Sequence, residues 1–85
     1  MSPSDVDRTI DRLKQGGQLV TQENGPDSVI SEVFEQLPDG RFRRSCTWIS
    51  YDVMAGSGGL EEFYTEEQLR QYLAMDQNWV EATWR

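Results

Sequence analysis

The chain has 85 residues, which is enough for one small hydrophobic core but not two, so we expect a single domain spanning 1–85. It carries 15 acids against 8 bases and no histidine, a formal charge of −7. That balance argues against direct binding to nucleic acid or to an anionic membrane, because both require a basic surface.

Cysteine content and hydropathy bear on where the protein works. Cys46 is the only cysteine, which excludes an internal disulfide. No apolar run approaches the roughly 20 residues needed to cross a bilayer. Residues 1–5 have neither the basic start nor the apolar stretch of a signal peptide. We therefore expect a cytoplasmic protein.

Residues 4–15 are predicted to form an amphipathic helix. Ser4 is a favourable N-cap, and Gly16-Gly17 supplies a stop signal. The acids and bases of this segment are close enough in sequence to compensate one another, which is typical of a solvated face. Apolar residues recur at the spacing of one helical stripe: Val6, Ile10 and Leu13.

Residues 18–23 are typical of a strand, which the turn at 24–27 closes. The next segment, 28–37, is ambiguous. Its apolar residues fall at helical spacing, but it is rich in β-branched and aromatic residues. We favour a strand, because the sequence of 37–41, Leu-Pro-Asp-Gly-Arg, normally joins two antiparallel strands through a bulge.

The loop length sets which residues share a face of this hairpin. A three-residue loop places Glu35 opposite Arg43, whereas a two-residue loop would set Glu35 against Arg44 and mix the two faces. With the longer loop, Cys46 is expected in the core rather than as a reactive thiol. The face opposite Glu35 then gathers Ile30, Phe34, Phe42, Cys46 and Trp48.

Three further segments follow the hairpin turn. Residues 41–53 are the longest strand candidate, and 60–64 are a further strand. Between them, Met54–Gly59 reads as a loose glycine-rich connection.

The C-terminal part begins with a helix that Thr65 caps, with Gln68 completing a capping box, and that extends to about Met75. The tail, 79–85, fits either a last strand or a helical turn, and its two tryptophans predict docking on the core. The expected fold class is α+β: an antiparallel sheet of about four strands with an N-terminal and a C-terminal helix packed on it.

Catalysis is not expected. Without histidine there is no Ser-His or Cys-His nucleophile pair. Glu61 and Glu62 are adjacent in a strand, so they point to opposite faces and cannot share a proton. The sequence has no zinc-ligand cluster or calcium loop, and the glycines at 56–59 lack the Lys-Ser/Thr of a phosphate loop. We predict no catalytic residue, no metal and no cofactor.

The only basic cluster consists of Arg41, Arg43 and Arg44. Its neighbours across the predicted turn are Glu35 and Asp39. We expect the three arginines to pair with acids of their own sheet rather than with nucleic acid.

Residues 52–67 hold five acids and no base. The structural interpretation is that Glu66 and Glu67 favour the first turn of a helix, while Glu61 and Glu62 keep a strand edge soluble. The functional interpretation is a negative patch with aromatic anchors, suited to a basic groove on another protein. The residues of this predicted partner-binding patch are Asp52, Glu61, Glu62, Phe63, Tyr64, Glu66 and Glu67.

Two hypotheses of function follow. The first is an inhibitor or regulator that occludes a basic, nucleic-acid-handling surface of a partner by partly imitating the phosphate backbone. Small acidic domains of this kind are common among phage-encoded inhibitors of bacterial defence, so an anti-CRISPR-like role in a bacterial or phage-infected cell fits. The alternative is an accessory or assembly subunit that docks through a sheet edge or through the Trp-containing tail.

Overall fold

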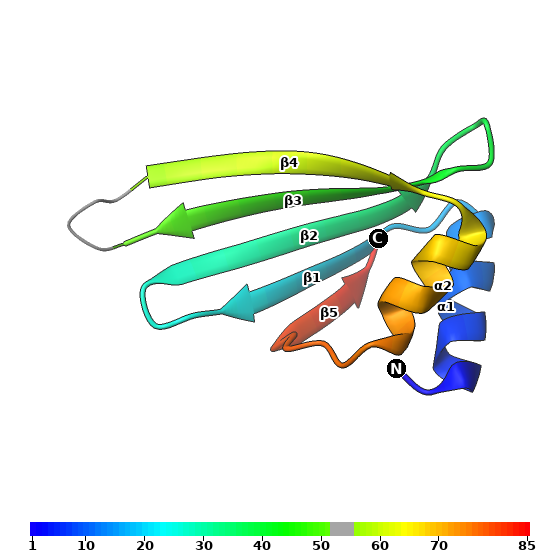
Figure 1. Ribbon diagram of the computed structural model, residues 1–85, viewed down its shortest axis with the longest axis horizontal. Coiled ribbons are helices and arrows are strands. Elements are labelled where there is room, and N and C mark those ends of the chain that lie inside the picture. The colour runs from blue at the N-terminus through cyan, green and yellow to red at the C-terminus, as the bar shows by residue number, and fades with distance from the viewer. Residues whose placement is uncertain (52–55) are drawn as a thin grey trace.

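The computed structural model describes residues 1–51 and 56–85, which form an antiparallel sheet in the order β4-β3-β2-β1-β5 with two helices on one face (Figure 1). The α+β fold class is therefore confirmed. The sheet has five strands in the described residues rather than about four, because the tail forms the last one. In chain order the elements are α1 (Pro3–Lys14), β1 (Leu19–Asn24), β2 (Ser28–Gln36), β3 (Phe42–Ser50), β4 (Gly56–Tyr64), α2 (Glu66–Ala74) and β5 (Glu81–Trp84).

Helix α1 begins earlier than the sequence pattern predicts. Its N-cap is Ser2, not Ser4, and the Ser2 hydroxyl accepts a 3.2 Å hydrogen bond from a backbone N–H of the first turn. Pro3 occupies the first helical position, where its fixed φ suits the helix and its missing N–H has no partner to lose. Gly16, with φ of 94°, follows the end of the helix. The predicted stripe is buried: Val6, Ile10 and Leu13.

The ambiguous segment 28–37 is a strand, and the β2–β3 hairpin has the predicted register with Glu35 opposite Arg43. A 2.7 Å backbone hydrogen bond closes the turn, and Gly40 takes the left-handed conformation there with φ of 91°. The five residues predicted to share the opposite face do share it by register: Ile30, Phe34, Phe42, Cys46 and Trp48.

The prediction of a loose loop over Gly56–Gly59 is wrong. These residues form the first half of β4 and pair with 47–50 of β3. Gly58 lies beneath the indole of Trp48, and a Cβ at that position would fall 2.3 Å from a ring carbon. The missing side chain makes room for the neighbouring ring, which is a common role of glycine within a strand.

Strand β3 ends at Ser50, short of the predicted end at 53. Tyr51 is described but is not part of a strand, and the last two residues of the predicted strand, Asp52 and Val53, lie outside the described residues. So do Met54 and Ala55 of the predicted connection.

Helix α2 has the predicted capping box. The hydroxyl of Thr65 accepts a 3.2 Å hydrogen bond from the Gln68 backbone, and the Gln68 side chain accepts a 2.9 Å bond from the Thr65 backbone. The tail, left open by the sequence, is strand β5, in which Trp84 pairs with Leu19 of β1. Both tail tryptophans pack against the core, as predicted.

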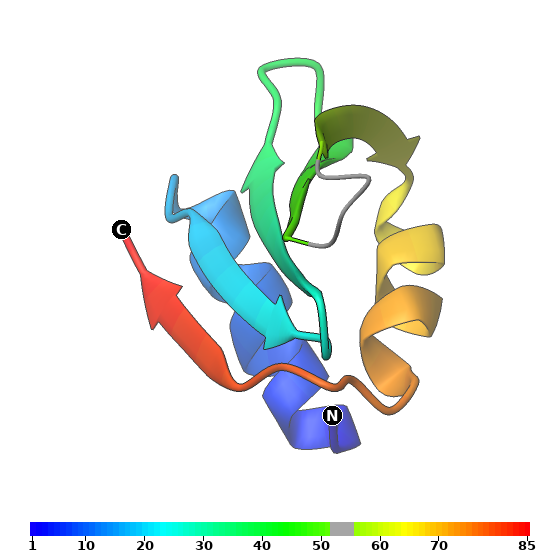
Figure 2. The ribbon, with the colours of Figure 1, turned by 90° about the vertical axis from the view of Figure 1, so that its left-hand side faces the viewer.

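The two helices cover only one end of the sheet, and strands β2, β3 and β4 extend beyond them (Figure 1). This gives a molecule 41 Å long and 22 to 26 Å across. Figure 2, a view along the long axis, shows how the sheet curves around α2. The projecting end carries exposed apolar side chains, among them Trp48, Ile49 and Leu60. The core lies between the helices and the covered end: Val6, Ile10, Leu13, Leu19, Phe34, Phe42, Leu69 and Leu73.

Neither α1, with 12 residues, nor α2, with 9, is long and apolar enough to cross a membrane, and these are the helices of the described residues.

Candidate functional site

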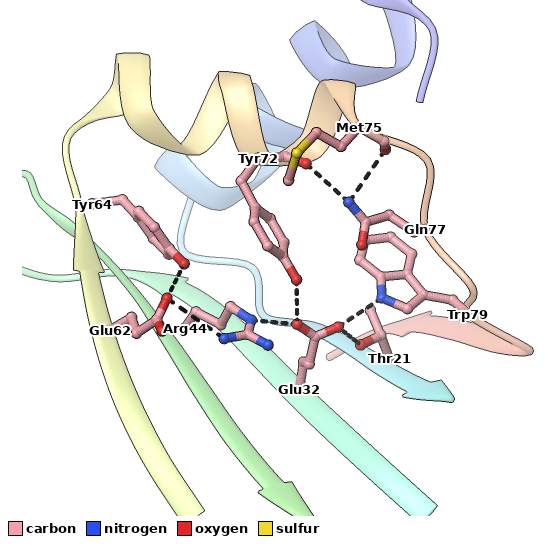
Figure 3. Close-up of polar contacts among 9 residues, drawn as sticks. All are labelled: Thr21, Glu32, Arg44, Glu62, Tyr64, Tyr72, Met75, Gln77 and Trp79. Carbon is pink, nitrogen blue, oxygen red and sulfur yellow. Dashed lines mark hydrogen bonds and ion pairs between the residues drawn. The ribbon is translucent and has the colours of Figure 1, made fainter. Parts of the chain in front are cut away.

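Glu32 of β2 is a buried carboxylate, with 4% of its surface exposed. Each of its two oxygens accepts two hydrogen bonds (Figure 3). The donors come from β1, β3, α2 and the segment before β5: Thr21 Oγ1 at 3.1 Å, Arg44 Nε, Tyr72 Oη at 2.7 Å and Trp79 Nε1 at 2.7 Å.

Burial alone would raise the pKa of Glu32, but the hydrogen bonds from Arg44, Tyr72 and Trp79 outweigh burial and lower the pKa below its ordinary value. The same contacts act on the donors. Burial opposes the charge of Arg44, yet Glu32 raises the pKa of its guanidinium. Burial and the bond to Glu32 both raise the pKa of Tyr72. Glu32 and Arg44 therefore form a buried ion pair.

A carboxylate has about four positions at which it can accept a hydrogen bond, and in Glu32 all four are occupied. It has no remaining position for a substrate proton or a metal ion. The arrangement instead holds α2 and the segment before β5 against the sheet.

The hydrogen-bonded group around Glu32 was not predicted from the sequence, although the β2–β3 register indicates the ion pair at its centre. Glu32 lies between Ile30 and Phe34 on the face predicted to be apolar, and Arg44 lies on the same face between Phe42 and Cys46. An acid and a base at interior positions of adjacent strands indicate a buried pair.

The structure divides the predicted acidic patch between the two faces of β4. Strand register puts Glu61 and Phe63 on the uncovered face and Glu62 and Tyr64 on the helix side. Asp52 lies outside the described residues. The expected opposite orientation of Glu61 and Glu62 is thus confirmed.

The acids of this stretch also differ in their contacts. Glu66 binds Lys14 of α1 and, at 3.3 Å, Arg70, and these two bonds lower the pKa of Glu66. Glu62 accepts a hydrogen bond from Tyr64, and burial followed by that bond raises the pKa of Tyr64 to about 12. Within residues 1–51 and 56–85, Glu61 and Glu67 form no ion pair.

Most of the positive charge is neutralised within the fold. The structure describes all eight bases, and six of them form ion pairs, among them the predicted pairs Arg43–Glu35 and Arg41–Asp39 at 2.8 Å. Another base, Arg12, packs 4.6 Å from the ring centre of Trp84. The six paired bases are Arg8, Lys14, Arg41, Arg43, Arg44 and Arg70.

A shallow hollow of about 380 Å³ lies where β4 leads into α2. Its lining is largely aromatic and apolar, and it includes Phe63 and Tyr64 of the predicted patch. The remaining lining residues come from α2 and its C-terminal end: Gln68, Gln71, Tyr72 and Met75.

In the described part of the chain, no group of three or more His, Cys, Asp or Glu is arranged to hold a metal ion. Cys46 is buried, as predicted, and burial raises the pKa of its thiol. A raised pKa leaves less of the reactive thiolate near neutral pH.

No known protein family, curated protein or solved structure matches this chain.

Proposed function

We propose that this protein is a non-catalytic binding protein that occupies a basic surface of a partner protein and so inhibits or regulates that partner. The observation that carries this proposal is the distribution of ion pairs. Six of the eight bases are already paired, and Arg12 and Arg85 form no ion pair with the acids of residues 1–51 and 56–85. Seven described acids form no ion pair with the described residues: Asp11, Glu23, Asp27, Glu61, Glu67, Asp76 and Glu81.

A surface of this kind attracts cationic groups and repels phosphates, so a basic protein surface suits it better than nucleic acid or an anionic membrane. Proteins that handle nucleic acid expose such basic surfaces, because they must neutralise a phosphate backbone. We favour the role of a phage-encoded inhibitor of bacterial defence, and the small size and negative charge of the chain support this role.

The chemistry of the described residues supports a role without catalysis. The most buried carboxylate, Glu32, is saturated with donors, and the thiol of Cys46 is buried with a raised pKa. Neither group is placed to accept a proton from a substrate or to attack one.

The alternative function, an accessory subunit, is supported by one of its two proposed docking routes. The long exposed edge of β4 suits docking of another chain. The tail does not, because the indole nitrogen of Trp79 donates to buried Glu32 and Trp84 pairs with Leu19 of β1.

The test is capture of partner proteins from the native host, followed by affinity measurement with two matched variants. Glu61→Lys with Glu67→Lys changes the formal charge from −7 to −3, since each substitution adds two units. Asp11→Lys with Asp76→Lys makes the same change elsewhere. We expect the first variant to weaken binding at least about tenfold, which is 1.4 kcal/mol, and the second to retain it. Binding should also weaken as NaCl rises from about 50 to 500 mM. The proposal would be disproved if the affinity did not change with the NaCl concentration or in either variant.

A further inference from the structure

Strand β4 is a sheet edge of unusual length. It has nine residues and pairs only with β3 among the described strands. Its register with β3 runs without a bulge from Tyr64 to Gly56, and it contains no proline and no lysine. Besides its two glutamates, β4 carries none of the features that usually protect a natural edge, such as a bulge, a proline or a lysine, and it is longer than β5, which has four residues. The outer side of β4 is therefore open to pairing with another strand.

The side chains along β4 leave its backbone accessible. Gly56, Ser57 and Gly59 are exposed and small, so a neighbouring chain can approach closely. Large apolar side chains lie exposed on β4 and on its neighbour β3, where an added strand would cover part of them: Trp48 (39% exposed), Ile49, Leu60 (43%) and Phe63 (47%).

The negative charge of β4 favours a basic segment as the strand that pairs with its open edge. Glu61 and Glu62 are the charged residues of β4 and point to opposite faces. Successive residues of an added strand also alternate between faces, so two consecutive basic residues can face both glutamates at once. A second copy of the chain is disfavoured, because each copy carries a charge of −7.

We propose that the β4 edge binds an extended basic segment of the partner as a sixth strand, with a Lys-Arg type pair opposite Glu61 and Glu62. Backbone hydrogen bonds hold the segment, and the two glutamates choose its charge and register. The hollow beside Tyr64 receives an apolar side chain of the same segment. This inference rests on the proposed function and specifies its partner chemistry.

The first test uses synthetic nine-residue Thr/Val peptides and isothermal titration calorimetry. The probe has a central Lys-Arg pair. One control has the same composition with one residue between Lys and Arg, which places both on one face, and another control carries Glu-Glu. We expect the separated charges to weaken binding about three- to fivefold, since only one of the two basic residues can then face a glutamate. The Glu-Glu peptide should not bind. Equal affinity for all three peptides would overturn the inference.

The second test examines the backbone. In an antiparallel pair, only alternate residues direct their N–H groups to the neighbouring strand. N-methylation of one alternate set in the Lys-Arg peptide should abolish binding, while methylation of the other set should leave it within about twofold. Equal effects of the two sets would overturn strand addition. Sedimentation equilibrium of the protein alone should give a monomer, and a dimer that the Lys-Arg peptide cannot dissociate would mean that a second copy occupies the edge.

Protein variants separate this inference from the proposed function. The double variant Glu61→Gln with Glu62→Gln should bind the Lys-Arg peptide and the peptide with separated charges equally well. The Glu67→Gln variant should still prefer the Lys-Arg peptide. If a captured partner binds with charge dependence but the Lys-Arg peptide does not compete with it, the docking mode fails and the proposed function stands. If the peptide binds as expected but no partner shows charge dependence, the proposed function fails instead.

Discussion

Glu32 and Arg44 form their ion pair diagonally across the β2–β3 ladder. Glu32 lies directly opposite Cys46, and Arg44 lies directly opposite Phe34, so the two charged side chains are offset by two residues along the ladder. Diagonal neighbours in a sheet are within reach of long side chains. The pair meets beneath α2, where Tyr72 and Trp79 also donate to the carboxylate. One side chain of the sheet thereby positions a helix and the segment that leads to the last strand.

The first prediction concerns the substitution Glu32→Gln. Either orientation of the amide turns its NH₂ group toward two donors, because each carboxylate oxygen accepts two hydrogen bonds. The change also leaves the largely buried Arg44 with only its longer contact to Glu62. We expect unfolding in urea to become easier by about 3 kcal/mol.

Glu62→Gln is the matched control, since Glu62 also contacts Arg44 but at 3.6 Å and with 48% of its side chain exposed. The control should change the free energy of unfolding by less than about 1 kcal/mol. Equal losses in the two variants would contradict a special role for the buried pair.

The second prediction concerns acid. Because the fold lowers the pKa of Glu32 below its ordinary value of 4.5, the stabilisation is complete above that value and is lost as pH falls through the folded-state pKa. Glu35 and Glu66 also have lowered pKa values and add to the same trend. The free energy of unfolding should fall steadily below about pH 4.5. The Glu32→Gln variant should show a smaller slope when measured by urea titration at each pH. An identical slope would assign the acid sensitivity to other groups.

The third prediction concerns the start of α2, which follows the β4 edge directly. Thr65→Ala removes the hydroxyl that accepts from the Gln68 backbone, so we expect a loss of about 1 kcal/mol. Thr65→Ser retains the hydroxyl and should lose only a few tenths of that. Thermal unfolding followed by circular dichroism compares the three proteins. Equal stability of the Ala and Ser variants would show that the Thr65 hydroxyl does not stabilise the helix.

The sequence was sufficient for features that depend on local chemistry. The capping box at Thr65 was found because its two residues stand three apart. The register of Glu35 with Arg43 followed from the length of a single turn, and that register also placed Cys46 in the core. These signals lie within a few residues of the feature they determine.

Features that depend on distant contacts were not predictable in the same way. The four donors around Glu32 come from segments up to 47 residues away in the sequence, so no local sequence pattern predicts that they meet. The strand in the tail became certain only through its pairing with β1. The predicted acidic patch was based on nearness in sequence, whereas strand alternation and the pairing of Glu66 with α1 separate its members.

Gly58 shows why a glycine-rich segment was mistaken for a loop. Glycine usually weakens a strand, but here the indole of Trp48 covers the backbone where a side chain would stand. The two residues are opposite each other in the β3–β4 ladder. The glycine and the tryptophan therefore act as a unit that only their pairing reveals.

The last prediction follows from that unit. Gly58→Ala would place a Cβ 2.3 Å from the Trp48 ring, so the indole must move away and lose contact with the sheet. We expect a destabilisation of about 1 kcal/mol, even though alanine restricts the unfolded chain more than glycine does. In a Trp48→Ala background the same substitution should be neutral or stabilising by about 0.5 kcal/mol, because the clash is gone. Chemical unfolding of the four proteins gives the coupling energy of the cycle. Ser57→Ala, on the opposite face of β4, should show no such coupling. A coupling energy near zero for Gly58 and Trp48 would mean that the ring does not rest on the glycine.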